Sequence, residues 1–236
     1  MKKLTLMLVI MFVISTLCIP ASAVEPNPNA VVVSDPVTQE ALTDLAILAF
    51  PEYEAKIRGE HLAGLARNAA TLANNTEPTL IISETRQLTD ETFVTYQEYD
   101  NGIVLTSGGT IVGKTVTDIY SEVTHTTTTI NMWLQLTGSQ QIMYVHNVQY
   151  TFLENGYGAV NNSGYIPSIS TARLEKLYHL IPLGSANGPA ILQYEAIFDS
   201  QIILPSGDSM PISYAGYLTL RVYPDSVELT GSYLPT

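Results

Sequence analysis

The stretch that decides the fold lies near the C-terminus and reads AILQYEAIFDSQIILPSGDSMPISYAGYLTLRVYPDSVELTGSY, residues 190–233. Apolar and polar residues alternate there in three runs. One face of these runs carries Leu192, Tyr194, Ala196, Phe198, Ile202, Leu204, Ile212, Tyr214, Leu218, Leu220, Val222, Val227, Leu229 and Tyr233. This period of two is typical of antiparallel strands with one buried face. Segments 205–208 and 224–225, which contain Pro, Ser, Gly and Asp, supply the turns between the runs.

The same period extends upstream from Thr79. Asp100-Asn101-Gly102 separates two β-rich runs, 92–99 and 103–112, and Asn-Gly tolerates the positive φ angles of a tight hairpin turn. Further strands are expected over 122–136 and 142–153. The second of these has an apolar face of Ile142, Tyr144, Val148, Tyr150 and Phe152.

Three local features interrupt this strand pattern. His146 breaks the apolar face of 142–153, and we interpret it as a hydrogen-bonded core or edge histidine. The Gly- and Asn-rich stretch 154–164 predicts a turn or loop. Leu174, Leu177 and Tyr178 have helical spacing, so Thr171–Leu180 is expected to form a short helix.

A helical pattern precedes the strands. Ser34 or Asp35 is a suitable N-cap, and Pro36 suits the first helical position, where its missing N–H is not needed. Pro51 interrupts the pattern because it cannot donate to a carbonyl one turn earlier, which predicts two helices or one sharply kinked helix. The apolar stripes are Leu42, Leu45, Leu48 and Ala49, then Tyr53, Ile57, Leu62, Leu65, Ala69 and Leu72.

We therefore expect an α+β fold that is predominantly antiparallel β, a sandwich or an open barrel. An N-terminal helical segment packs its apolar face on the sheet. The expected boundaries are a signal peptide over 1–23, a flexible leader over 24–35, the helical segment over 36–76 and the β-rich domain over 77–236.

The first 23 residues predict export. Lys2 and Lys3 precede an apolar run from Leu4 to Ile19, and Ala21-Ser22-Ala23 is a typical cleavage site. The apolar run is shorter than the roughly 20 residues of a membrane span, and no stable span is expected after cleavage. We expect the mature protein to be secreted or associated with the cell surface.

Charge and cysteine content exclude several classes of function. The signal holds two of the ten Lys and Arg residues and none of the 22 Asp and Glu, so the mature chain carries eight against 22, a net charge of −14. Such acidity opposes binding to nucleic acid. The one cysteine, Cys18, lies inside the signal, which leaves the mature chain without disulfides or thiol nucleophiles.

No motif for a zinc protease, a serine-hydrolase elbow, a dinucleotide or a calcium loop is present. Neither a metal nor a cofactor is expected.

The run 122–136 offers the one candidate binding surface. Its polar face carries Asn131, Gln135 and His125 around Trp133, the only tryptophan in the chain. An aromatic ring flanked by amides can stack on a sugar and hydrogen-bond its edges. Two alternatives stay open: Trp133 lies beneath the N-terminal helices, or the Thr-rich segment is only an edge strand of high β propensity.

These observations favour a secreted, non-enzymatic binding or interaction protein whose partner is an extracellular protein or a glycan. One alternative is a carbohydrate- or cell-wall-binding module that uses the Trp133 face. Another is an extracellular hydrolase, because antiparallel β folds can draw catalytic residues from distant strands.

Overall fold

The computed structural model describes residues 38–61, 78–119, 123–137, 141–153, 157–161, 164, 172–185, 188–203 and 209–235. The predicted signal and leader lie outside these residues, as do the expected cap residues 34–36, the stripe residues 62–72 and the predicted turn 205–208. No helix among the described residues is long and apolar enough to cross a membrane.

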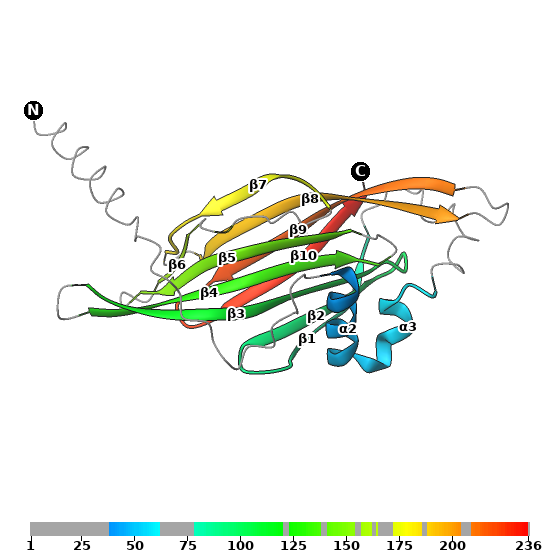
Figure 1. The fold of residues 1–236 in the computed structure, drawn as a ribbon. Coiled ribbons are helices and arrows are strands. Elements are labelled where there is room, and N and C mark those ends of the chain that lie inside the picture. The colour runs from blue at the N-terminus through cyan, green and yellow to red at the C-terminus, as the bar shows by residue number, and fades with distance from the viewer. Residues whose placement is uncertain are drawn as a thin grey trace, which may run out of the picture.

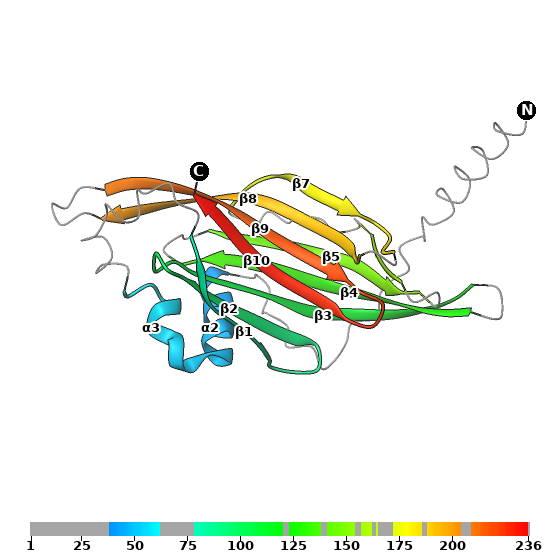
Figure 2. The same ribbon diagram turned by 180° about the vertical axis from the view of Figure 1, so that it is seen from behind.

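Two antiparallel sheets form a sandwich (Figure 1), which confirms the predicted α+β, mainly antiparallel fold. The first sheet is a six-stranded meander of β1 (Leu80–Gln87), β2 (Thr92–Tyr99), β3 (Val104–Ile119), β4 (Val123–Leu136), β5 (Ile142–Phe152) and β6 (Gly158–Asn161). The second has the order β10-β9-β8-β7, with β7 (Arg173–Ile181), β8 (Ala190–Ile203), β9 (Ser209–Val222) and β10 (Val227–Pro235). Seen from behind, the second sheet crosses the middle of the first, with β10 in front of it (Figure 2).

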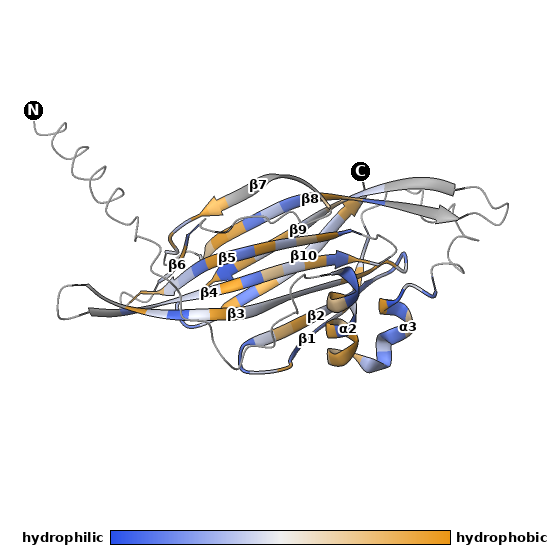
Figure 3. Cartoon of the chain, viewed as in Figure 1, coloured by the Kyte–Doolittle hydropathy of each residue, from blue (hydrophilic) through white to orange (hydrophobic). Residues whose placement is uncertain are grey.

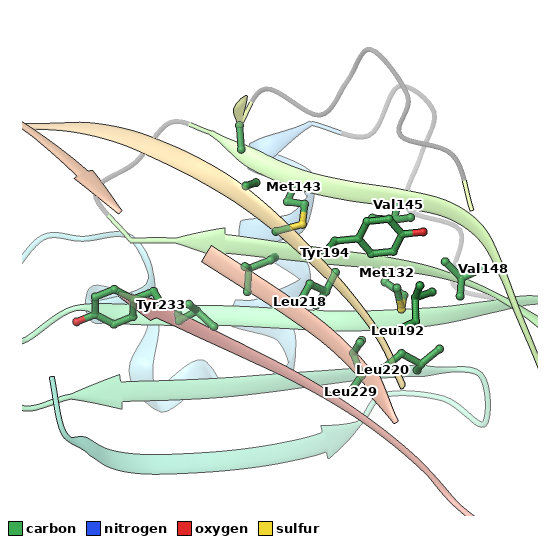
Figure 4. Close-up of a cluster of buried hydrophobic side chains, with 14 of the residues drawn as sticks. Met132, Met143, Val145, Val148, Leu192, Tyr194, Leu218, Leu220, Leu229 and Tyr233 are labelled. Atoms are coloured by element: carbon green, nitrogen blue, oxygen red, sulfur yellow. The ribbon is translucent and has the colours of Figure 1, made fainter. Parts of the chain in front are cut away.

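The main core fills the space between the sheets. Alternating hydropathy along the strands (Figure 3) places one apolar face of each sheet against the other. The close-up in Figure 4 shows Met132, Met143 and Val145 of the first sheet near Leu218 and Tyr194 of the second. The predicted apolar residues of 190–233 that the structure describes with their side chains all belong to this cluster or pack against it.

One edge of the sandwich is bridged by hydrogen bonds. Val160 N donates to Pro182 O at 3.0 Å, and Gly184 N donates to Gly158 O at 2.8 Å. β6 thereby connects the first sheet to the chain that follows β7. The stretch 154–164 was expected to be a turn or loop, but it contains the short strand β6.

A helical unit covers the outer face of the first sheet. It consists of α2 (Gln39–Ala49), the 3-10 turn η1 (Pro51–Tyr53) and α3 (Glu54–Ile57), on the side away from the second sheet (Figures 1 and 2). The break at Pro51 confirms the predicted interruption. α2 begins at Gln39, three residues after the expected position, because extended Thr38 is the N-cap and its Oγ1 accepts from Ala41 N at 3.1 Å.

The prediction of a single apolar face along β5 is wrong, because a β-bulge interrupts the strand. Ile130 pairs with Val148 but Met132 pairs with Val145, so His146 and Asn147 both lie opposite one residue of β4. The side chains therefore change sides: Ile142 and Tyr144 pack in the cluster beneath the helices, while Val148 and Tyr150 lie in the main core. His146 is half-buried, and its ring packs edge-on to Tyr144 at 4.7 Å between centroids.

The predicted helix over Thr171–Leu180 is wrong, because this segment forms β7 and pairs antiparallel with β8. Its ladder shifts register twice, between Leu174 and Lys176 and between Leu177 and His179. Each irregularity inserts a residue, so apolar positions recur every three residues instead of every two. That spacing imitates a helix in the sequence.

Candidate functional site

Trp133 lies beneath the helical unit, where it belongs to a second apolar cluster with Leu42 and Phe50. Its side chain is only 1% exposed, and its indole Nε1 has no hydrogen-bond partner among the described residues. The β4 pairing sets Gly108 directly beside it. Trp133 therefore lies beneath the N-terminal helices, which is one of the two alternatives left open by the sequence. The buried ring offers no open surface for stacking on a sugar.

Gln135 joins β4 to α2. It is 6% exposed, and its Nε2 donates to Thr43 Oγ1 at 2.9 Å. The Thr43 hydroxyl in turn donates to Gln39 O at 2.8 Å, so it must accept from the amide nitrogen of Gln135. This chain of donors orients the amide and leaves the buried Oε1 of Gln135 without a hydrogen-bond partner among the described residues.

Asn131 has a structural contact on the same face of β4. Its Oδ1 accepts from Asn147 N at 2.9 Å, which closes the bulge of β5. Asn147 has a φ of 56°, a left-handed conformation that Asn tolerates better than most residues. The contact therefore stabilises the point at which β5 changes its buried side.

His125 lies far from the other three predicted site residues. It is eight residues from Trp133 along β4, about 26 Å at 3.3 Å per residue, and it pairs with Thr117 of β3. The structure thus places the four predicted residues on one strand face but does not gather them into one site. Of the four, Gln135 lines the cleft described next.

That cleft opens between α2, α3 and the end of β4, and its volume is about 430 Å³. We call it the helix–sheet cleft. Its lining residues come from two segments that are 75 to 98 positions apart in the sequence: Gln39, Glu40, Thr43, Ile57, Arg58, Glu60, Gln135, Leu136 and Thr137. Ligand sites of small molecules commonly have this size and combine apolar walls with a few polar groups.

Of the lining residues, Gln135 alone is among the site residues predicted from the sequence. One signal was available in the sequence. Thr43 is a polar residue that follows Leu42 and lies one turn before Ala46, inside the apolar stripe of α2, and it is 92% buried. A polar side chain in such a stripe needs a hydrogen-bond partner from another element, which here is Gln135.

Charges at the cleft are unequal. Arg58 is the one cationic lining residue, and its guanidinium already pairs with Glu54 at 3.0 Å and with Asp44 at 3.5 Å. Hydrogen bonding to Glu54 is the main cause that raises the pKa of Arg58. Glu40 and Glu60 line the cleft with no ion pair among the described residues.

A polar clamp fixes the other end of the helical unit to β1 and β2. Lys56 Nζ contacts both carboxylate oxygens of Glu98 at 2.6 and 2.7 Å, and Tyr96 Oη donates to the same carboxylate at 3.0 Å. Burial, with this hydrogen bond, raises the pKa of Tyr96 well above its usual value. Tyr53 of η1 stacks on Tyr96 with ring centroids 4.3 Å apart.

Arg86 of β1 completes the clamp. Its guanidinium hydrogen-bonds Glu52 and Glu84, donates to Ala49 O at 3.0 Å, and lies 4.5 Å from the centre of the Phe50 ring. The hydrogen bond to Arg86 lowers the pKa of Glu52, and the hydrogen bond to Glu52 raises the pKa of Arg86. The helical unit is therefore held in a defined position over the sheet, which gives the cleft a stable wall.

Comparisons with models of protein families, with curated proteins and with solved structures found no match to this chain. Among the described residues, no group of three or more His, Cys, Asp or Glu side chains could hold a metal ion. Function must therefore be inferred from the helix–sheet cleft and the residues around it.

Proposed function

We propose that this chain is an exported, non-enzymatic binding protein that holds a small ligand in the helix–sheet cleft. The observation that carries the proposal is the cleft itself, about 430 Å³ in volume, with the helical unit on one side and the end of β4 on the other. Ile57 and Leu136 give the cleft apolar walls, and the polar side chains beside them can orient a bound molecule.

Two features of the sequence support the remaining parts of the proposal. The segment over residues 1–23 has the layout of a cleavable signal. The sequence contains neither a zinc-protease motif nor a serine-hydrolase elbow, which favours binding over catalysis. The buried position of Trp133 lends no support to an open glycan-binding face, and retention of the protein on insoluble polysaccharide would be the result that restores that alternative.

The test uses residues 24–236, which contain every residue that the structure describes. Because Cys18 is the chain's only cysteine, a cysteine introduced into 24–236 can carry a single nitroxide label. One variant places the label at the cleft by Glu60→Cys, and a control places it at the distant β9–β10 turn by Asp225→Cys. A library of amines, sugars, amino acids and short peptides is then screened by ligand-detected NMR.

We expect the resonances of bound compounds to broaden strongly with the label at position 60 and weakly with the label at position 225. A library without any binder, or binders that broaden equally with both labels, would contradict the proposal. Export is checked separately, because the exported protein should have the mass of a chain that begins at Val24.

A further inference from the structure

We infer that Asn101 is a site of spontaneous deamidation, and that the β2–β3 turn and strand β10 together control the rate of this modification. In the reaction the backbone nitrogen of Gly102 loses its proton and bonds to Cγ of Asn101, while the side-chain –NH2 takes up a proton and leaves as ammonia. Water then opens the cyclic imide to give aspartate or isoaspartate. The reaction consumes water, releases ammonia and involves no oxidation, so it needs no further reactant.

The sequence contains three Asn-Gly pairs, at 101–102, 155–156 and 187–188. A glycine after an asparagine favours deamidation, because no side chain shields the glycine nitrogen and the glycine backbone rotates with little hindrance. Of the three asparagines, Asn101 is the one that the structure describes, and it is half-buried, so that water reaches the turn. The other two asparagines serve as references with the same dipeptide.

The backbone of the turn keeps the two reacting atoms of Asn101 and Gly102 apart. Gly102 N donates to Tyr99 O at 2.9 Å, and Gly102 has a φ of 81°, which is the pattern of a type I turn followed by a left-handed glycine. At the third position of a type I turn ψ is about 0°, so Gly102 N eclipses the backbone nitrogen of Asn101 and not its Cβ. Ring closure needs Gly102 N on the same side as Cβ, so the turn must open before Asn101 reacts.

Strand β10 holds this turn closed. Asn101 Oδ1 accepts from Ile103 N at 3.1 Å and from Tyr233 Oη at 2.8 Å. Tyr233 lies near the end of β10 (Figure 4), and its ring packs edge-on against Tyr99, the first residue of the turn, with ring centroids 4.6 Å apart. The turn therefore opens only when Asn101 loses its contact with Tyr233, a residue 132 positions away in the sequence.

The two hydrogen bonds to Asn101 Oδ1 have opposite effects on the reaction. They polarise the side-chain carbonyl and would stabilise negative charge on its oxygen, which favours attack at Cγ. This assistance acts only after Gly102 N has reached Cγ, and the closed turn prevents that approach. The Gly102 proton is also held by Tyr99 O, away from bases in the solvent. Protection therefore prevails in the folded protein, and deamidation proceeds through the opened turn.

The modification is irreversible without a repair enzyme, so it records each opening that leads to reaction. Isoaspartate places an additional carbon atom in the backbone, and a loop of three residues between paired strands has no room for it without a change in the turn. The modified turn is therefore not expected to restore the hydrogen bond from Tyr233. Deamidation of Asn101 thus makes a temporary separation of β10 from the β2–β3 turn permanent.

The experiment incubates residues 24–236 at a mildly alkaline pH, once folded and once in urea that unfolds the chain, and measures deamidation at all three Asn-Gly pairs by peptide mass spectrometry. Asn101 should react at least about tenfold more slowly in the folded protein than in urea. Tyr233→Phe removes the hydroxyl and keeps the ring, and it should accelerate the reaction of folded Asn101 about fivefold, which corresponds to about 1 kcal/mol.

The matched control is Tyr214→Phe, which removes a hydroxyl from the ring packed edge-on against Tyr233 at 5.6 Å between centroids. In this variant the rate at Asn101 should change less than about twofold. The rates at Asn155 and Asn187 should be the same in both variants as in the parent protein. Circular dichroism verifies that both variants are folded before the rates are compared.

Three results would overturn the inference: no modification of Asn101 in the unfolded chain, equal rates at Asn101 with and without urea, or equal acceleration in the two phenylalanine variants. The comparison of the folded and unfolded parent protein requires no substitution, so it tests the control by the turn even if Tyr233→Phe does not fold. In that case Asn101 in the unfolded variant should react as fast as Asn101 of the parent protein in urea, and a slower reaction would contradict the inference.

Discussion

At the scale of single residues, the position of Trp133 is decided by the glycine beside it. Gly108 pairs with Trp133 across β3 and β4, and a Cβ at position 108 would lie 2.7 Å from both Cε2 and Cζ2 of the indole and from Phe93 O. Because Gly108 has no side chain, the indole can lie close against β3 beneath α2. The ring thereby becomes part of the support for the helical unit.

Gly108→Ala is expected to destabilise the protein by about 1–3 kcal/mol, because the added methyl group must displace the indole or the backbone of β2. Urea unfolding followed by Trp133 fluorescence measures this loss, and native emission should shift to longer wavelength as the ring loses its cover. The control is Gly188→Ala, since a Cβ there meets nothing within 4 Å. Equal stability of the two variants would argue against a tight contact at Gly108.

At the scale of elements, the helical unit is held mainly by buried apolar surface, to which Phe50 contributes a large ring. Phe50 is fully buried at the end of α2 and packs against Tyr96 with ring centroids 5.7 Å apart, and against the guanidinium of Arg86. In the ion pairs of Arg86 with Glu52 and Glu84 the side chains are 39–43% exposed, and pairs that water reaches contribute only about 0–1 kcal/mol each. The buried apolar contacts, those of Phe50 among them, therefore contribute more to the attachment of the unit than these ion pairs.

Phe50→Ala should cost about 3–5 kcal/mol, because it removes a large buried ring and leaves a cavity. If the helical unit docks as described, the variant should also expose Trp133 to an added quencher while far-UV circular dichroism retains the strand signal. Leu48→Ala on the same helix is the matched control, since Leu48 is 67% exposed. There the stability should change by less than about 0.5 kcal/mol, and a large loss in this control would show that the exposed side of α2 has been misassigned.

At the scale of the whole molecule, the two sheets are joined through a core that contains several tyrosines. Burial raises the pKa of Tyr99, Tyr194 and Tyr214 to about 12 each. Burial also raises the pKa of Tyr233, which packs edge-on against Tyr99 and Tyr214. The folded sandwich therefore favours neutral phenols between its sheets.

This core predicts a loss of stability at alkaline pH. The folded-state pKa values lie above the unfolded value of about 10, so the stabilising contribution is complete below pH 10 and is lost as the pH rises toward about 12. The measurement is the urea midpoint at a series of pH values from 8 to 12. The variant Tyr99→Phe should show a shallower decline, and a midpoint that stays constant across the series would contradict the buried tyrosine core.

The sequence by itself determined the local features. The alternation over 190–233 predicted β8, β9 and β10 because one buried face imposes a period of two. Asn101-Gly102 predicted the turn between β2 and β3, where Gly102 indeed has a φ of 81°. Pro51 predicted the break after α2 because a missing N–H acts within one turn of the chain.

Only the tertiary structure decided which surfaces remained open. The bulge at His146 and Asn147 and the two irregularities of β7 arise from pairing with neighbouring strands, so they disturb a period that is read along one strand alone. Trp133 is buried and Gln135 lines a cleft because α2 packs on β4. The hydrogen bond between Thr43 and Gln135 joins residues that are 92 positions apart in the sequence. Whether a side chain is buried depends on which other segment packs against it. The pattern of residues along one segment does not specify that partner.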